Sequence, residues 1–260
     1  MRISLFVLIL FKSFVGYTQS TLIIDSLQST HLNEYRSFFV YKPANFDSNK
    51  DYPVLYYTDG QKMVEHDYKM IFDSLISSGT IEPIVVIGAY SNEKECGINL
   101  TLRQVEYTDT QCNGKTDEKR YDSHKSFFLQ ELPMHIHNKY GVKEDSNKTM
   151  FFGVSNGAGF GMTLFLQAEK KFKNYICLST LGNVPVKKNV YKNKKKPFLY
   201  VSYGSQEFFM LVDQYENLVN KLTRKKFKFT PHKYDGGHLD KDWKPELVKA
   251  LKATAFIKLR

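Results

Sequence analysis

The sequence predicts an α/β fold in which helices cover both faces of one mostly parallel sheet. Short runs rich in aromatic and β-branched residues alternate along the chain with longer amphipathic stretches, which is the order of elements in such folds. One run, residues 83–90, is apolar throughout, as expected for a strand buried on both faces of a parallel sheet. The 260 residues, 42% of them hydrophobic, suffice for one full core, so we expect a single domain over residues 21–260.

The first expected elements are two strands, a helix and the buried strand. Residues 36–43 and 52–60 combine aromatic and β-branched residues between turn formers, which predicts strands. Residues 62–79 carry apolar side chains at helical spacing and close on a glycine, which predicts one helix. The apolar strand over residues 83–90 follows directly.

The middle of the chain is polar and then helical. Residues 91–123 are too long for a simple connector, so we expect a functional loop or a partial cap over the sheet. Residues 125–141 have a helical pattern with an internal proline, Pro133, which predicts a kinked helix.

The second half continues the alternation of strands and helices, and its elements follow by the same criteria. The expected strands are residues 149–155, 174–180, 197–204 and 227–234, and the expected helices are 156–171, 207–223 and 244–259. Strands joined through helices pair in parallel, so their carboxyl ends line one edge of the sheet. Ligand sites in such sheets lie at that edge.

Residues 1–20 have the features of a secretory signal peptide. Arg2 is followed by an apolar run over residues 3–11 that is too short to span a bilayer, and Lys12 ends it. A buried N-terminal strand is the alternative interpretation. We expect an exported protein, periplasmic or secreted, with no membrane span in its mature form.

The net charge of +10 is concentrated in two lysine-rich runs, residues 186–197 and 221–229. Such runs can bind nucleic acid or an anionic surface, but they also occur in solvated loops and strand rims. The chain has no zinc-finger spacing, RNA-recognition motif or helix-turn-helix signature, so we expect no nucleic-acid partner. The segment between Ser179 and Pro197 is short and poor in apolar residues, which predicts an open site without a large helical lid.

Three cysteines are present, Cys96, Cys112 and Cys177. In an exported chain Cys96 and Cys112 bracket a polar loop and could form a disulfide, although the sequence is equally consistent with two free thiols. Cys177 lies inside an apolar run, and we expect it to be a buried free thiol.

A Gly-x-Ser-x-Gly pattern, residues 153–157, lies between an expected strand and an expected helix. The pattern alone is weak, since it arises by chance in about one chain in ten of this length. Its context is specific, because in a nucleophile elbow the serine sits on a strained strand-to-helix turn whose small neighbours let the helix approach. We therefore expect Ser155 to be a nucleophile.

The same turn predicts an oxyanion hole. The first backbone N–H groups of a helix lack intrahelical partners and lie at the positive end of its dipole, so the N–H of Asn156 is the expected first donor. The second donor normally follows an earlier strand. Gly60 and Gln61 are the candidates, and the sequence does not choose between them.

A serine nucleophile needs a base, and His238 is the best placed of the seven histidines. It follows two glycines in a loop between the last strand and the last helix, which can bring its ring over the carboxyl edge of the sheet. The other histidines fall in expected helices, in a strand or before the first strand: His31, His66, His124, His135, His137 and His232. No HExxH motif or Cys/His cluster occurs, so we expect no metal site and no cofactor.

The third member of the site should be an acid just past the preceding strand. Glu207 has this place, and Asp213 is the alternative, about two turns into the following helix. Three further acids lie beside the histidine in sequence, a placement that rarely gives the right orientation: Asp235, Asp240 and Asp242. The order Ser155, Glu207, His238 is the order of the triad in α/β-hydrolases.

With these residues in place, the chain resembles the esterase-D-like, or "putative esterase", branch of the α/β-hydrolases. This branch contains enterochelin esterases, feruloyl esterases and S-formylglutathione hydrolases. The matching stretches are YPVLYYTDG (52–60), TLRQVEYT (101–108), FFLQELPMHIHNKYGV (127–142), GVSNGAGFGM (153–162), VSYGSQE (201–207) and DGGHLDKDWKPELVKAL (235–251). The resemblance covers most of the chain from about residue 36. It implies a three-layer α/β-hydrolase fold with an antiparallel N-terminal edge, and it implies Ser155 as nucleophile, His238 as base and Glu207 in the acid position, where the family often has aspartate.

Together these features predict a serine esterase that cleaves carboxylic esters through an acyl-enzyme intermediate. Its substrate would be a small-molecule or polysaccharide ester, and siderophore, feruloyl and acetyl esters are all compatible. Arg103 is a candidate to bind a carboxylate or catecholate oxygen, or to hold its loop through a salt bridge. Tyr107 and Trp243 are candidates for an aromatic wall. Basic charge near the site would favour anionic substrates.

Two other functions are compatible with the same residues. One is an acyltransferase with the same triad, which would pass the acyl group to a sugar or lipid alcohol. The other is a catalytically silent hydrolase scaffold that acts as a binding protein. A silent scaffold has no need to keep both Ser155 and His238, which argues against the second.

Overall fold

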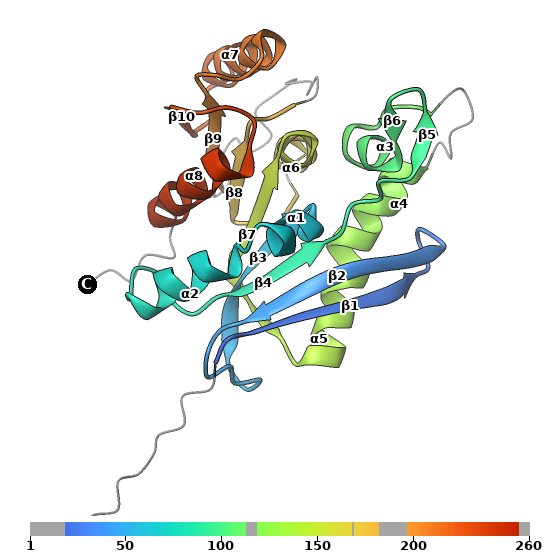
Figure 1. Ribbon diagram of the computed structural model, residues 1–260, viewed down its shortest axis with the longest axis vertical. Coiled ribbons are helices and arrows are strands. Elements are labelled where there is room, and N and C mark those ends of the chain that lie inside the picture. Colours follow the sequence, from blue (N-terminus) through green and yellow to red (C-terminus); the bar gives the residue numbers. More distant parts are fainter. Residues whose placement is uncertain (1–18, 113–118, 168, 182–196, 255–260) are drawn as a thin grey trace, which may run out of the picture.

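The computed structural model describes residues 19–112, 119–167, 169–181 and 197–254 (Figure 1). Residues 1–18 of the expected signal peptide and residues 186–196 of the first lysine-rich run lie outside the described residues. None of the helices in the described part of the chain is long and apolar enough to cross a membrane.

An eight-stranded sheet forms the centre of the molecule, in the order β1-β2-β4-β3-β7-β8-β9-β10. Its strands are β1 (Thr21–Ser29), β2 (Glu34–Lys42), β3 (Asp51–Thr58), β4 (Val85–Ala89), β7 (Lys143–Val154), β8 (Asn174–Leu178), β9 (Phe198–Gly204) and β10 (Thr230–Tyr234). β1 and β2 form an antiparallel edge, and all strands from β4 to β10 in this order are parallel. The expected mostly parallel sheet is confirmed.

Helices cover both faces of the sheet (Figure 1). The helices are α1 (Gly60–Glu65), α2 (Lys69–Ser77), α3 (Leu102–Thr108), α4 (Arg120–Ser126), the π-helix η1 (Phe127–Glu131), α5 (Leu132–Tyr140), α6 (Asn156–Leu166), α7 (Phe209–Arg224) and α8 (Asp240–Ala253). Side chains alternate along each strand, so Val54 and Tyr56 of β3 belong to one buried cluster and Leu55 and Tyr57 to a second. The first cluster includes residues of α5, α6 and α7, and the second includes residues of α1, α2 and α8.

Two expected helices differ from the structure in ways that their sequences explain. The single helix expected over residues 62–79 is divided into α1 and α2, because Asp67 between them adopts a left-handed φ of 53° that interrupts a right-handed helix. The helix expected over residues 125–141 contains the π-helix η1, which ends two residues before Pro133. A proline lacks the N–H group and crowds the preceding turn, and a π-helical turn accommodates this by widening the helix.

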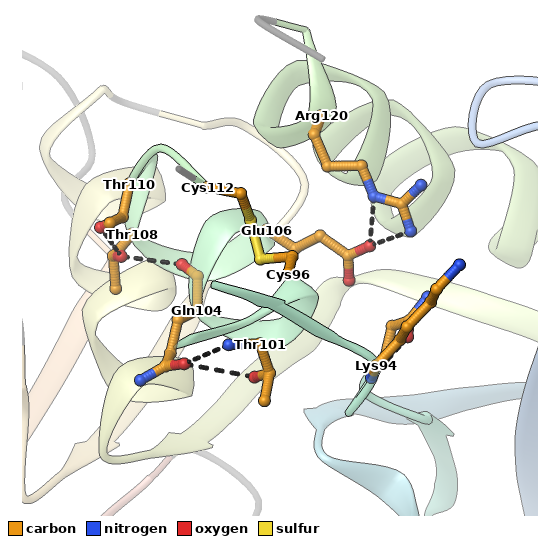
Figure 2. Close-up of a disulfide and its surroundings, with 10 residues drawn as sticks. Lys94, Cys96, Thr101, Gln104, Glu106, Thr108, Thr110, Cys112 and Arg120 are labelled. Atoms are coloured by element: carbon orange, nitrogen blue, oxygen red, sulfur yellow. Dashed lines mark hydrogen bonds and ion pairs between the residues drawn. A yellow bond between two sulfur atoms is a disulfide. The ribbon is translucent and has the colours of Figure 1, made fainter. Parts of the chain in front are cut away.

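The polar stretch after β4 folds over the carboxyl edge of the sheet. It contains β5 (Glu95–Gly97), β6 (Leu100–Thr101) and α3. The Cys96–Cys112 disulfide closes a loop that starts within β5 and includes β6 and α3 (Figure 2). The buried Glu106 of α3 accepts a hydrogen bond from Arg120 of α4 (Figure 2) and another from Arg36 of β2. The disulfide therefore closes this stretch on itself, and the buried ion pairs of Glu106 hold α3 against α4 and β2.

Candidate active site

Ser155 occupies the turn between β7 and α6, with a φ of 55° and a ψ of −126°. Such a backbone is costly for a residue with a side chain and persists only where the surroundings enforce it. Here the Ser155 N–H donates to the carbonyl of Leu178 at the end of β8, while the N–H groups of Gly159 and Leu181 both donate to the Ser155 carbonyl. The strained turn is therefore held by three hydrogen bonds.

The two glycines of the pattern permit this turn because the backbone is crowded on both sides of it. A Cβ at Gly153 would lie 2.6 Å from the carbonyl carbon of Gly157. A Cβ at Gly157 would lie 2.2 Å from Oγ1 of Thr58, at the end of β3. The absence of side chains at these positions lets α6 begin directly against β3 and β7.

His238 lies in the loop between β10 and α8, and its ring is fixed by a carboxylate. Its Nδ1 is 2.7 Å from Oε2 of Glu207, which follows β9. Because a carboxylate accepts, Nδ1 carries the proton and Nε2 presents a lone pair. The rings of Phe208 and Trp243 pack against the imidazole, with centroid distances of 5.5 and 4.8 Å.

Glu207 also accepts hydrogen bonds from two buried side chains. Its Oε1 accepts from Oγ of Ser179 at 2.5 Å and from the hydroxyl of Tyr234 at 3.1 Å. Nε1 of Trp243 donates to the same Ser179 oxygen at 2.8 Å. Burial raises the pKa of Glu207, but the hydrogen bonds from His238, Ser179 and Tyr234 outweigh it and hold the pKa below its usual value. The carboxylate is therefore ionised when it faces the imidazole at neutral pH.

The alternative acid does not reach the histidine. Asp213 is exposed on α7, where the side-chain amide of Asn217 donates to it at 3.0 Å. Among the three acids next to His238 in sequence, Asp242 accepts from the N–H of Gly237 and Asp240 from the hydroxyl of Tyr68. Asp235 accepts from the side chains of Ser205 and Gln206.

Ser155 and His238 line the same pocket, which has a volume of about 490 Å³. This is within the size range of small-molecule sites. The remaining lining residues are Asp59, Gln61, Lys62, Glu65, Glu93, Arg103, Val154, Asp240 and Trp243.

The two candidates for the second oxyanion donor have different surroundings. Gly60 packs against β4, because a Cβ there would lie 2.5 Å from the carbonyl oxygen of Gly88. Gln61 lines the pocket, and its side chain is bound to Ser91 at the end of β4. Asn156 is the first residue of α6, and its side-chain oxygen accepts from Arg103 at 3.1 Å.

The three residues expected to contact substrate have different positions. Arg103 lines the pocket, but its guanidinium is bound to Asp59 in two places. Trp243 lines the pocket with an indole N–H that is used by Ser179. Tyr107 does not line the pocket, contrary to expectation. It lies on the core face of α3, where its ring stacks on Phe160 at 5.8 Å and is buried.

The remaining histidines are held by other parts of the molecule. His66 at the end of α1 lies 3.2 Å from Asp240, and His232 of β10 lies 2.6 Å from Glu246. His124 is buried, and burial together with Arg36 and Arg120 holds its pKa well below the usual value. In the described part of the chain, no group of three or more His, Cys, Asp or Glu side chains is arranged to bind a metal ion.

Three residues of the site have no motif in the sequence. They lie at or just after the ends of three different strands: Ser179, Tyr234 and Asp59. The folded sheet brings Ser179 and Tyr234 into contact with Glu207, and it brings Asp59 into contact with Arg103. For Asp59 the sequence offered one indication of a place in the site, because this residue directly precedes Gly60 at the end of an expected strand.

Comparison with known proteins places the chain among esterases. A family model described as "Putative esterase" matches residues 29–254. Among solved structures, a ferulic acid esterase is similar with a TM-score of 0.71 and 20% identity, covering 91% of this chain and 97% of that chain. An S-formylglutathione hydrolase from Staphylococcus aureus gives 0.68 and 14%, covering 91% and 96%. A ferulic acid esterase from Anaeromyces mucronatus, in complex with ferulic acid, gives 0.68 and 14%, covering 94% and 93%. At these identities the solved structures show a shared fold.

Proposed function

The chain belongs to the putative esterase family and is a carboxylic ester hydrolase, and we propose that it works through an acyl-enzyme intermediate on Ser155. The observation that carries this proposal is the strained turn of Ser155 in one pocket with His238, whose ring is oriented by the 2.7 Å hydrogen bond to Glu207. These are the nucleophile, base and acid that acyl transfer requires.

In the proposed reaction, Nε2 of His238 takes the hydroxyl proton of Ser155 while Oγ attacks the ester carbonyl carbon. The tetrahedral intermediate collapses when the imidazolium gives that proton to the alkoxy oxygen, so that the alcohol leaves and an acyl-serine remains. Water then attacks the acyl carbon and loses its proton to His238. Ser155 Oγ departs with a proton from the imidazolium, and the carboxylic acid is released.

The oxyanion of both intermediates needs donors that are in place before the reaction. We assign this role to the backbone N–H groups of Asn156 and Gln61. The position of Asn156 next to Ser155 supports the first, and the contact of Gln61 with the pocket supports the second. Gly60 packs against β4 instead. Removing one such donor typically lowers kcat by about 10² to 10³.

The proposed substrate is a small neutral ester, such as an acetyl or feruloyl ester of a saccharide. The pocket is lined by four carboxylates, Asp59, Glu65, Glu93 and Asp240, against the cations Lys62 and Arg103. Arg103 is neutralised by Asp59, and Lys62 lies 3.0 Å from Glu65. This charge balance disfavours anionic esters, which the basic composition of the whole chain had favoured.

We also propose that the protein is exported to an oxidising compartment. The Cys96–Cys112 disulfide supports this, because such bonds persist mainly in extracellular and periplasmic proteins.

Labelling with a fluorophosphonate tests the mechanism directly. We expect the intact mass of the wild-type protein to increase by one adduct, and the masses of Ser155→Ala and His238→Ala to stay unchanged at the same time point. Ser155→Ala should also remove turnover of p-nitrophenyl acetate and methyl ferulate without a change in the far-UV circular dichroism. An unlabelled wild-type protein, or a Ser155→Ala variant with full activity, would show that Ser155 is not the nucleophile.

A further inference from the structure

Most N–H groups of the Arg103 guanidinium donate to other side chains of the protein. Its Nε donates to Oδ1 of Asp59 at 2.6 Å and its Nη2 to Oδ2 at 2.9 Å, a two-point contact of the guanidinium with the carboxylate. Its Nη1 donates to the side-chain oxygen of Asn156 at 3.1 Å. The side chain of Asp59 is 3% exposed and that of Arg103 17%, so water competes little for this pair.

The two residues that Arg103 binds are linked to the two proposed oxyanion donors. Asp59 lies two positions before Gln61, in the turn that follows β3, and Asn156 is itself the other proposed donor. One guanidinium therefore connects two segments that are far apart in sequence and that must keep a fixed distance for both N–H groups to reach one oxygen atom.

The backbone of Asp59 is also held by α3. Its φ of 63° and ψ of 42° are left-handed, a conformation that most residues avoid and that aspartate adopts more readily. The N–H of Asp59 donates to the hydroxyl of Tyr107 at 3.2 Å, and the Tyr107 ring lies 5.2 Å from the Arg103 guanidinium. Arg103 and Tyr107, both from α3, therefore hold the Asp59 turn from its side chain and from its main chain.

We propose that Arg103 is a positioning residue that sets the separation of the oxyanion donors by binding Asp59 and Asn156 together. This inference rests on the proposed function. It replaces the expectation that Arg103 binds a substrate anion, since three of its five N–H groups already have protein acceptors. Substrate can bind without Arg103, but the transition state then meets donors that are misplaced.

The experiment compares Arg103→Gln, Arg103→Lys, Asp59→Asn and the double variant Arg103→Gln/Asp59→Asn with wild type. Lys148→Gln is the matched control, because it removes an ion pair with Glu82 at 2.8 Å in the amino-terminal half of β7. Fluorophosphonate titration gives the fraction of active enzyme in each preparation. The readouts per active site are kcat and KM for p-nitrophenyl acetate and the Ki of an aryl trifluoromethyl ketone, whose hemiketal with serine carries an oxyanion.

We expect kcat to fall about 10- to 100-fold in each single variant, the range for a small misplacement of catalytic groups, with KM nearly unchanged. The Ki of the ketone should rise by the same factor. Arg103→Lys should not restore kcat, since an ammonium group cannot make the two-point contact. The double variant should lose little more than each single variant, because both remove one connection. Lys148→Gln should keep the wild-type kcat and Ki.

Other outcomes would overturn the inference. A rise in KM at constant kcat would show that Arg103 binds substrate. A lower melting temperature with unchanged kcat and Ki per active site would show that the pair only stabilises the fold. Wild-type enzyme that turns over substrate but is not labelled at Ser155 would overturn the proposed mechanism and this inference together, whereas labelled wild type with fully active Arg103 variants would overturn this inference alone.

Discussion

Glu207 is a buried carboxylate whose ionised form is favoured by the folded state. Three side chains donate to it, and they outweigh the cost of burial, so its pKa lies below the usual value. A lowered pKa means that the folded protein binds the proton more weakly than the unfolded chain does. Glu207 therefore adds stability above the unfolded pKa of about 4.3, and this contribution is lost as the pH falls through the lower, folded value.

Glu207→Gln tests both the electrostatic and the catalytic role of this carboxylate. We expect the difference in unfolding free energy between wild type and variant to be largest at pH 7 and to shrink below about pH 4.3, because wild type alone loses the Glu207 contribution. Urea unfolding at a series of pH values measures this. At pH 7 the kcat of the variant should fall by up to about 10⁴, as when a triad acid becomes an amide.

The alternative acid of the sequence analysis supplies the control. Asp213→Asn changes an exposed carboxylate on α7, the helix that follows Glu207, and it should alter neither kcat nor the pH dependence of stability. Parallel stability curves for wild type and Glu207→Gln would show that the carboxylate gains nothing from ionising in the folded state.

At the scale of single residues, the sequence predicted the positions that carry a motif and missed those that depend on the sheet. Ser155 and His238 stand next to glycines in loops at strand ends, which made them visible. Ser179 and Tyr234 are an ordinary serine and tyrosine at the ends of strands, and their contacts with Glu207 cross 28 and 27 positions of the chain. Tyr107 was misplaced because residues 91–123 were expected to form a polar loop or cap, and only the helix α3 turns this side chain into the core.

The elbow is the contact of three elements, β3, β7 and α6. The start of α6 packs directly against Thr58 of β3. Gly157 allows this close contact because it has no side chain. The hydroxyl oxygen of Thr58 is buried and has no hydrogen-bond partner among the described residues. Its removal should therefore cost little by itself.

Gly157→Ala should push α6 away from β3, because the added Cβ would lie 2.2 Å from Oγ1 of Thr58. We expect a loss of about 1 to 3 kcal/mol in unfolding free energy and of about 10² in kcat. Chemical denaturation and steady-state kinetics measure the two effects. The double variant Gly157→Ala/Thr58→Ala removes the clashing atom and should recover part of both, whereas no recovery would place the damage elsewhere in α6.

At the scale of elements, strong patterns predicted strands and helices, and local backbone geometry limited their bounds. Every strand expected from residue 36 onward is present in the sheet. β1 was missed because its alternating, partly polar residues carry a weak apolar signal, and its pairing with β2 supplies most of its order. The break between α1 and α2 depends on the left-handed Asp67, which the helical spacing of the surrounding residues conceals.

At the scale of the whole molecule, the Cys96–Cys112 disulfide joins the beginning and the end of the polar stretch that follows β4. It closes a loop with a sequence separation of 16 around α3, which carries Arg103 and Glu106. The pairing that the sequence left open is present in the structure. The third cysteine, Cys177, is buried in β8, and burial raises the pKa of its thiol.

The oxidation state of the whole chain can be counted with a thiol reagent. We expect Ellman's reagent to find no reactive thiol in the native protein and one per chain after denaturation without reductant, because only Cys177 is free. Three thiols in that second sample would mean that the disulfide is absent. Cys96→Ala/Cys112→Ala should lower the unfolding free energy by about 3 kcal/mol, the chain-entropy value for a loop of this length. Cys177→Ala, which leaves the disulfide intact, is the control for loss of a sulfur atom.

Among the strands of the described residues, β10 is the last in the sheet and pairs with β9 alone. An open edge of this kind can recruit a strand from another molecule and begin aggregation. In β10 the second residue is Pro231, which has no N–H to offer, and Lys233 adds a charge that a second copy would repeat. The five residues of β10 that lead the chain toward His238 thus also carry two features that oppose the addition of a further strand at this edge.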